Sequence, residues 1–151
     1  MFDTLRVKSW REQDIPRLAE IERRAYPFPW SATILGDCLA AGYLGWVAWS
    51  RGEIAAYAVA MTIMDEAHLL NLCTAPEWQG QGVGRGMLRH VMDECAAHGM
   101  TRMLLEVRAS NTPAMGLYRG EGFGEDGVRK GYYPASGGRE DAVLMSRALP
   151  V

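Results

Sequence analysis

Glycines stand at every second position of the segment "PEWQGQGVGRGML": Gly80, Gly82, Gly84 and Gly86. Apolar residues at helical spacing begin at Val83, so the glycines lie where a helix is expected to start. A helix N-terminus presents unpaired N–H groups and about half a positive charge, and bare backbone lets an anion approach them. Arg85 adds a cation. The segment therefore predicts a phosphate site built mainly from main-chain groups, against the plainer interpretation of a flexible turn.

Two familiar phosphate motifs fit this segment poorly. A Walker A loop requires a lysine after its last glycine, and none is present. A Rossmann fingerprint requires G-x-G-x-x-G directly after a strand and an acidic residue about 20 positions later. Glu106 follows Gly86 by 20 residues, which supports this alternative. The G-x-G-x-G spacing, the intervening "PEWQ" and preceding strands that are expected to be antiparallel all disfavour it.

A third pattern, Q-x-x-G-x-G, runs from Gln79 to Gly84. It resembles the pyrophosphate loop of the GNAT superfamily of N-acetyltransferases, which joins the fourth strand to the third helix and binds acetyl-coenzyme A. The resemblance implies cofactor contacts from Gly80, Gln81, Gly82, Val83, Gly84 and Arg85.

Acetyl transfer from a thioester to an amine needs a base for the ammonium proton, dipoles for the oxyanion and an acid for the leaving thiolate. The segment "LLEVRASNTPAMGLY" offers Glu106 at the end of an expected strand as base. Asn111 and Tyr118 are seven residues apart, nearly two helical turns, so they share one face of the following helix. Taken singly, each has a plainer interpretation: a solvent-facing glutamate, an ordinary N-cap and a core tyrosine.

Several separated motifs are similar to the RimI type of this superfamily, the bacterial ribosomal-protein-alanine N-acetyltransferases. They are "FPWS", "DEAHLLNLCTAPEWQGQGVGRGML", "LEVRASN" and "YYP", in that order over nearly the whole chain. The resemblance implies Glu106 as general base, Tyr118 as general acid and protein N-termini, with alanine first, as substrate. It also implies cofactor contacts from Leu72, Cys73, Thr74 and Asn111.

Two positions depart from the family pattern. Gly80 stands where a long basic or polar side chain is usual, which would remove one pyrophosphate contact. Cys73 occupies a strand position whose backbone N–H is expected to polarise the thioester carbonyl. A covalent role for its thiol is the less favoured alternative, because a buried free cysteine usually behaves as a small apolar residue.

Two aromatic clusters, "YPFPW" and "GYYP", are both expected on loops. In the plainer interpretation these aromatic side chains only fill space beneath the loops and have no role in function. By resemblance, Phe28 and Trp30 from the first and Tyr132 and Tyr133 from the second would line a groove for the first residues of a peptide.

The elements expected to position these residues follow the order β-α-α-β-β-β-α-β-α-β-β. The sequence therefore predicts an α/β protein with a mixed sheet, the GNAT acyl-CoA N-acyltransferase fold, as one domain spanning residues 1–151. The strands and helices are expected at residues 5–10, 14–25, 31–41, 43–75 (three strands), 83–98, 101–108, 111–122 and, as two strands, in the remainder.

Composition narrows the partners. A formal net charge of −2 argues against broad nucleic-acid binding. Three separated cysteines suggest neither a disulfide framework nor a metal site, and no apolar run approaches the ~20 residues of a membrane helix. A cytoplasmic enzyme is expected. Acetylation of a lysine or a small amine, and a non-catalytic nucleotide or coenzyme A binding module, remain as alternatives.

Overall fold

The computed structural model describes residues 1–150, so Val151 lies outside the described residues. One seven-stranded sheet runs through them in the order β1-β2-β3-β4-β5-β7-β6. The strands are β1 (Arg6–Ser9), β2 (Leu44–Ser50), β3 (Glu53–Ile63), β4 (Glu66–Thr74), β5 (Arg102–Arg108), β6 (Gly124–Ala135) and β7 (Gly138–Ala148). The helices are α1 (Ile15–Ala25), α2 (Ala32–Ala40), α3 (Val83–Ala97) and α4 (Thr112–Gly120), with short 3-10 turns η1 (Phe2–Thr4), η2 (Glu12–Asp14) and η3 (Pro76–Trp78).

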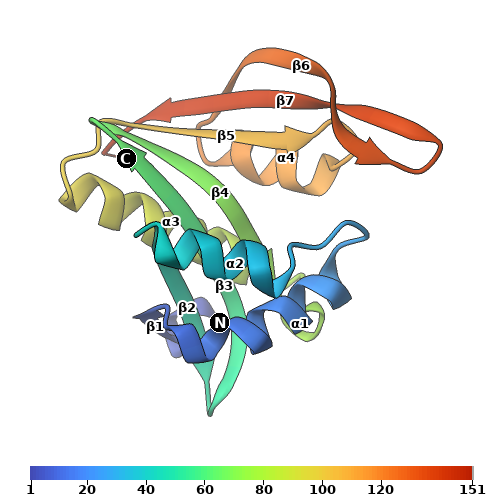
Figure 1. Cartoon of the computed structure of the whole chain (residues 1–151). Helices are drawn as coiled ribbons and strands as arrows, with labels where there is room; N and C mark the ends of the chain where they lie inside the picture. The colour runs from blue at the N-terminus through green and yellow to red at the C-terminus, as the bar shows by residue number, and fades with distance from the viewer. Residues whose placement is uncertain (151) are drawn as a thin grey trace.

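Helices cover both faces of the sheet (Figure 1). Buried residues of α3 and α4, including Met87, Leu88 and Tyr118, share one core with Met103 and Leu105 of β5. Residues of α1 and α2 pack with Val47 of β2 in a second core. This arrangement confirms the predicted mixed α/β fold and its order of elements. None of the helices in residues 1–150 is both long and apolar enough to cross a membrane.

Local sequence signals explain where the helices begin and end. Ser31 caps α2 by accepting a hydrogen bond from the Ile34 N–H at 3.2 Å. Asn111 caps α4 in the same way through the Ala114 N–H, at 3.3 Å. Gly99 follows α3 with φ +87°, the left-handed conformation that favours glycine at a helix end.

The sheet opens between β4 and β5, the only parallel neighbours among the described strands. They pair only from Glu66–Arg102 to Leu69–Leu105, although β4 continues to Thr74 and β5 to Arg108. Figure 1 shows the two strands starting side by side and then diverging. Beyond Leu69 and Leu105 the facing backbone edges of the two strands are therefore not paired with each other, and we call this opening in the pairing the slot.

An irregularity in β4 lies next to this slot. The pairing of β3 with β4 shifts between Val59–Asn71 and Ala60–Leu69, so Leu70 is an extra residue on β4. Such a bulge bends its strand and re-aims side chains. It coincides with the point where β4 leaves β5.

The expectation that "GYYP" lies on a loop is wrong. Tyr132 and Tyr133 belong to β6, the edge strand, whose pairing with β7 is interrupted between Arg129 and Tyr133 and resumes at Tyr133–Glu140. An edge strand tolerates a proline because one side of its backbone needs no partner. The other cluster, "YPFPW", lies between α1 and α2 as predicted.

Candidate active site

The glycine-rich segment forms a tight turn and the first turns of α3. Gly80 and Gly82 have φ +74° and +78°, a region that side chains disfavour, and Gly82 is the N-cap of α3. The first N–H groups of the helix, from Val83 to Arg85, have no partner within the helix and so can receive an anion. The other two glycines allow close packing. A Cβ on Gly84 would lie 3.4 Å from Thr74 Oγ1, and one on Gly86 would overlap the Phe2 ring.

Side-chain contacts hold the base of this turn. The Gln79 side chain donates to the Thr74 carbonyl at 3.1 Å, and the Gln81 side chain donates to the Glu77 carbonyl at 3.1 Å. Arg24 of α1 makes a two-pronged contact with the Glu77 carboxylate, at 2.8 and 3.2 Å. The turn is therefore linked to β4 and to α1.

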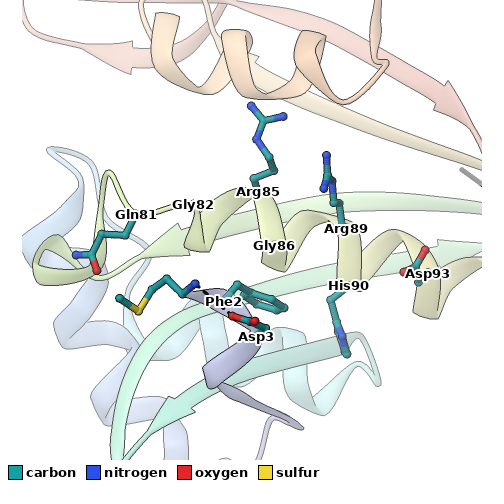
Figure 2. A pocket seen from close by; sticks show the side chains of 10 residues that line it. Phe2, Asp3, Gln81, Gly82, Arg85, Gly86, Arg89, His90 and Asp93 are labelled. Carbon is teal, nitrogen blue, oxygen red and sulfur yellow. Dashed lines mark hydrogen bonds and ion pairs between the residues drawn. The ribbon is translucent and has the colours of Figure 1, made fainter.

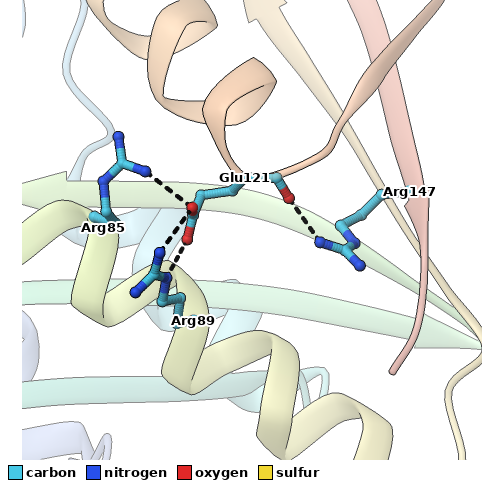
Figure 3. A network of polar contacts seen from close by, with 4 residues as sticks. All are labelled: Arg85, Arg89, Glu121 and Arg147. Atoms are coloured by element: carbon cyan, nitrogen blue, oxygen red, sulfur yellow. Dashed lines mark hydrogen bonds and ion pairs between the residues drawn. The ribbon is translucent and has the colours of Figure 1, made fainter. Parts of the chain in front are cut away.

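The predicted cation, Arg85, points from α3 toward α4 with Arg89 one turn further on (Figure 2). Arg85 Nη1 donates to Glu121 Oε2 at 2.9 Å, and Arg89 donates to both carboxylate oxygens of the same residue (Figure 3). The Glu121 side chain is only 6% exposed. Its hydrogen bond to Arg89 is the main cause that lowers its pKa. One carboxylate thus orients two guanidinium groups, and the cluster keeps an excess of positive charge beside the glycine turn.

A shallow hollow of about 490 Å³ lies at the start of α3. The N-terminal turn η1 forms one wall of the hollow, where Phe2 lies against Gly86 (Figure 2). Gln81, Gly82 and Arg85 contribute from the glycine turn.

Glu106 lies on β5 at the edge of the slot, on the opposite face from the core of α3 and α4. Its side chain is 29% exposed, and Arg129 Nη2 of β6 is 3.7 Å from Glu106 Oε1. The Tyr132 hydroxyl also interacts with this carboxylate, and that hydrogen bond is the main cause of the raised pKa of Tyr132. A solvent-reachable carboxylate with one counter-charge can accept a proton from an incoming ammonium group. No local sequence signal links Arg129 to Glu106, because the two residues lie on different strands.

Tyr118 is buried in α4 and packs edge-on against Phe123, with ring centroids 5.7 Å apart. Burial is the main cause that raises its pKa to about 12, and the proximity of Tyr133 adds to it. Burial likewise raises the pKa of Tyr133 to about 12, with a second contribution from the charge of Glu106. Tyr133 is therefore near both predicted catalytic groups, and Tyr118 remains a neutral proton donor at physiological pH.

This geometry agrees with the comparison to known families. The model of the acetyltransferase (GNAT) family matches residues 10–123. The chain belongs to the GNAT acetyltransferase family. Members of this family use acetyl-coenzyme A as acetyl donor.

Curated relatives resemble this GNAT protein over nearly its whole length. The [ribosomal protein bS18]-alanine N-acetyltransferase of Escherichia coli K12 is 41% identical over 145 residues, which cover 96% of this chain and 97% of the relative. A Bacillus subtilis protein named as a candidate enzyme of the same kind is 34% identical and covers 92% of each chain.

Solved structures share the GNAT fold. The crystal structure of the E. coli ribosomal-protein-S18-alanine N-acetyltransferase has a TM-score of 0.91 and 38% identity, and the match covers 97% of this chain and 95% of that one. A phosphinothricin acetyltransferase from Sinorhizobium meliloti, solved in complex with AcCoA, has a TM-score of 0.80 and 23% identity, with 97% and 89% covered. The second likeness concerns the fold alone.

The three predicted cofactor residues on β4 of this GNAT chain have different environments. Leu72 accepts a hydrogen bond from the Tyr26 hydroxyl through its carbonyl, at 2.7 Å. The Cys73 side chain is fully buried on the α1 side, and burial raises its pKa. A thiolate is therefore disfavoured, which argues against a covalent role for Cys73. The Ala75 N–H donates to the Ala55 carbonyl, so the alternation of the antiparallel ladder also turns the Cys73 N–H toward β3, which argues against the expected polarising role of this N–H. Thr74 lies against Gly84 at the start of α3.

A buried carboxyl group that the sequence analysis missed lies behind these residues. Glu22 of α1 is 1% exposed, accepts hydrogen bonds from the Trp30 N–H at 3.1 Å and the Asn71 side chain at 3.0 Å, and has an unpaired Oε2. Burial raises its pKa. The signal for it was available: Glu22 falls on the apolar stripe of α1, between Leu18 and Ala25. It fastens the α1–α2 segment to the bulge of β4.

The predicted groove residues divide into two groups. Phe28, Tyr132 and Tyr133 lie toward the end of β5 that carries Glu106: Arg108 contacts the rings of Phe28 and Tyr133, and the Tyr132 ring is 4.9 Å from that of Tyr133. Trp30 instead packs against the second core beneath α1 and α2. Among residues 1–150, no group of three or more His, Cys, Asp or Glu side chains is arranged to hold a metal ion.

Proposed function

We propose that this GNAT protein acetylates the N-terminal α-amine of a small-subunit ribosomal protein, with alanine as the first residue, using acetyl-coenzyme A. The observation that carries the proposal is the 41% identity, over 96% of the chain, to a bS18-alanine N-acetyltransferase. Its support in this chain is a carboxylate, Glu106, on the part of β5 that does not pair with β4, and a buried phenol, Tyr118, on α4. Residues 1–151 would act as one catalytic domain in the cytoplasm.

Acetyl-coenzyme A would lie in the slot between β4 and β5. Its pantetheine arm would pair with the open edge of β4 at Leu72 and Thr74, on either side of Cys73, as an added strand pairs with a sheet edge. Its pyrophosphate would meet the N–H groups of the turn from Gly80 to Arg85. The side-chain amide of Asn111 would hydrogen-bond the arm from the start of α4.

The chemistry would then be direct transfer. Glu106 takes a proton from the α-ammonium group, the free amine attacks the thioester carbonyl carbon, and a backbone N–H on the open edge of β4 stabilises the oxyanion. The C–S bond breaks as the tetrahedral intermediate collapses, and Tyr118 gives its proton to the thiolate. The attacking nitrogen loses its second proton as the amide forms, and a proton returned through water restores the Tyr118 phenol. An α-amine has an unperturbed pKa of ~8 against ~10.4 for lysine, so one carboxylate deprotonates it more readily at neutral pH.

The test uses two peptides from a small-subunit ribosomal protein. One begins with a free alanine, and the other has the same sequence with a blocked α-amine and a free internal lysine. Mass spectrometry after incubation with acetyl-coenzyme A is expected to show one added acetyl group on the first peptide and little on the second. Equal labelling of the blocked peptide would point instead to lysine acetylation, and labelling of neither to another amine.

A further inference from the structure

Three segments distant in sequence meet at Arg108, the last residue of β5 and two positions after Glu106. Its guanidinium carbon lies 4.7 Å from the centre of the Phe28 ring and 4.5 Å from that of the Tyr133 ring. Phe28 comes from the α1–α2 segment and Tyr133 from β6. Arg108 therefore links the two aromatic walls of the predicted acceptor groove.

Hydrogen bonds fix the same guanidinium group. Arg108 Nη1 donates to the Pro134 carbonyl at 2.6 Å and to Glu140 Oε1 of β7 at 2.9 Å. The other oxygen of Glu140 accepts the Ser110 N–H at 3.2 Å, and the hydrogen bond from Arg108 is the main cause that lowers the pKa of Glu140. The ion pair thus persists at neutral pH. The Arg108 side chain is 22% exposed, which is low for an arginine near the end of a strand.

Only an arginine can make all these contacts together. A guanidinium group is planar, so it stacks on aromatic faces while its edge donates several hydrogen bonds in fixed directions. A lysine ammonium keeps the charge but has no flat face. Among residues 1–150, no direct ring–ring contact joins Phe28 to either tyrosine of β6. The spacing between the walls is therefore set by the guanidinium group.

We propose that Arg108 is a positioning residue for the acceptor: it holds Phe28 and Tyr133 at the separation that receives an extended peptide beside Glu106. This inference rests on the proposed function for the identity of the acceptor. The donor side is not involved, since the glycine turn and the Arg85–Glu121–Arg89 cluster make no recorded contact with Arg108. The acceptor KM should respond to this residue, and the affinity for acetyl-coenzyme A should not.

The experiment compares Arg108→Lys with Arg17→Lys. Arg17 is a matched control, because its guanidinium group also lies over an aromatic ring, that of Trp49 at 5.7 Å, and donates to a backbone carbonyl, that of Gly52, away from the groove. Arg108→Lys is expected to raise the KM for the alanine peptide about tenfold, with kcat changed less than about threefold, as for loss of a partly desolvated cation–π stack. Arg17→Lys should leave both constants unchanged.

A second measurement does not depend on the acceptor. Amide hydrogen exchange of Phe28, Tyr132 and Tyr133 should accelerate in Arg108→Lys and stay unchanged in Arg17→Lys, while the dissociation constant for acetyl-coenzyme A stays within about twofold of wild type. Unchanged exchange at these amides, or a fall in kcat with KM preserved, would overturn the inference. Failure of the wild type to acetylate the peptide would overturn the proposed function, and the exchange data would still decide whether Arg108 fixes the two walls.

Discussion

The proposed donor side of the site consists mainly of backbone groups, whereas the proposed acceptor side consists mainly of side chains. The donor side uses backbone groups of one continuous segment, Gln79 to Arg85, backed by the buried face of α3. The acceptor side uses long side chains from separate segments, with Phe28 41% and Tyr132 42% exposed. Backbone groups held by a helix and a core are unaffected by most substitutions, which suits a ligand that does not vary. Side chains can be replaced by substitution, which suits an acceptor that differs between enzymes.

The two proposed catalytic residues, Glu106 and Tyr118, lie on opposite faces of the sheet. Glu106 faces the acceptor walls and interacts with Arg129 and Tyr132. Tyr118 belongs to the core behind the donor. If this division is correct, substitutions should separate into effects on chemistry, on donor affinity and on acceptor affinity.

The largest effect is expected from Glu106→Gln. Loss of the general base should lower kcat by roughly 10²–10⁴-fold, while acetyl-coenzyme A binding stays intact. Activity should recover in part at high pH, where the α-amine arrives already deprotonated. Steady-state kinetics between pH 7 and about 10 measures both effects. Glu125→Gln, which removes an exposed ion pair with Arg119, is the control and should be silent. Full activity of Glu106→Gln at pH 7 would show that Glu106 is not the general base.

Tyr118→Phe should come next, with kcat lowered about 10²-fold, because the thiolate then leaves without its proton donor. The ring still fills the space beside Phe123, so the melting temperature should change little. The raised pKa of about 12 has a sign that can be checked: the acid form persists as pH rises, so Tyr118 should cause no alkaline loss of rate below that value. A fall of kcat near pH 10 in the wild type that is absent in Tyr118→Phe would show that the pKa of Tyr118 is not raised in this way.

A smaller effect is expected from Gly82→Ala on the donor side. The residue has φ +78°, where a Cβ costs about 1–2 kcal/mol, so the turn should distort and acetyl-coenzyme A should bind about tenfold more weakly. At saturating donor, kcat should be preserved. Gly36→Ala is the matched control, since Gly36 lies within α2 with open space around it and should tolerate the change. Calorimetric titration with acetyl-coenzyme A gives the comparison, and equal affinity of both variants would show that the turn does not bind the donor.

The same division explains how much could be predicted from the sequence. The glycine turn before α3 could be located from the sequence because its residues are consecutive, and hydrophobic periodicity located α3 and β5 within one or two residues. The interaction of Arg108 with Phe28, 80 positions earlier, and with Glu140, 32 positions later, has no local signature. The early end of the β4–β5 pairing is equally hidden, since strand register depends on tertiary packing. "GYYP" suggested a loop because glycine and proline are common in turns, yet an edge strand accommodates both.

The short pairing of β4 with β5 also has a mechanical consequence. Only four residue pairs join β1–β4 to β5–β7 through the sheet, whereas β5 and β7 are joined by seven. Because this pairing is short, we expect thermal motion to change the angle between β1–β4 and β5–β7 at the junction of β4 with β5. Acetyl-coenzyme A bound between β4 and β5 would add hydrogen bonds along the unpaired part of the two strands and would restrict this motion. The cosubstrate would therefore stabilise the sheet of the enzyme until it is consumed.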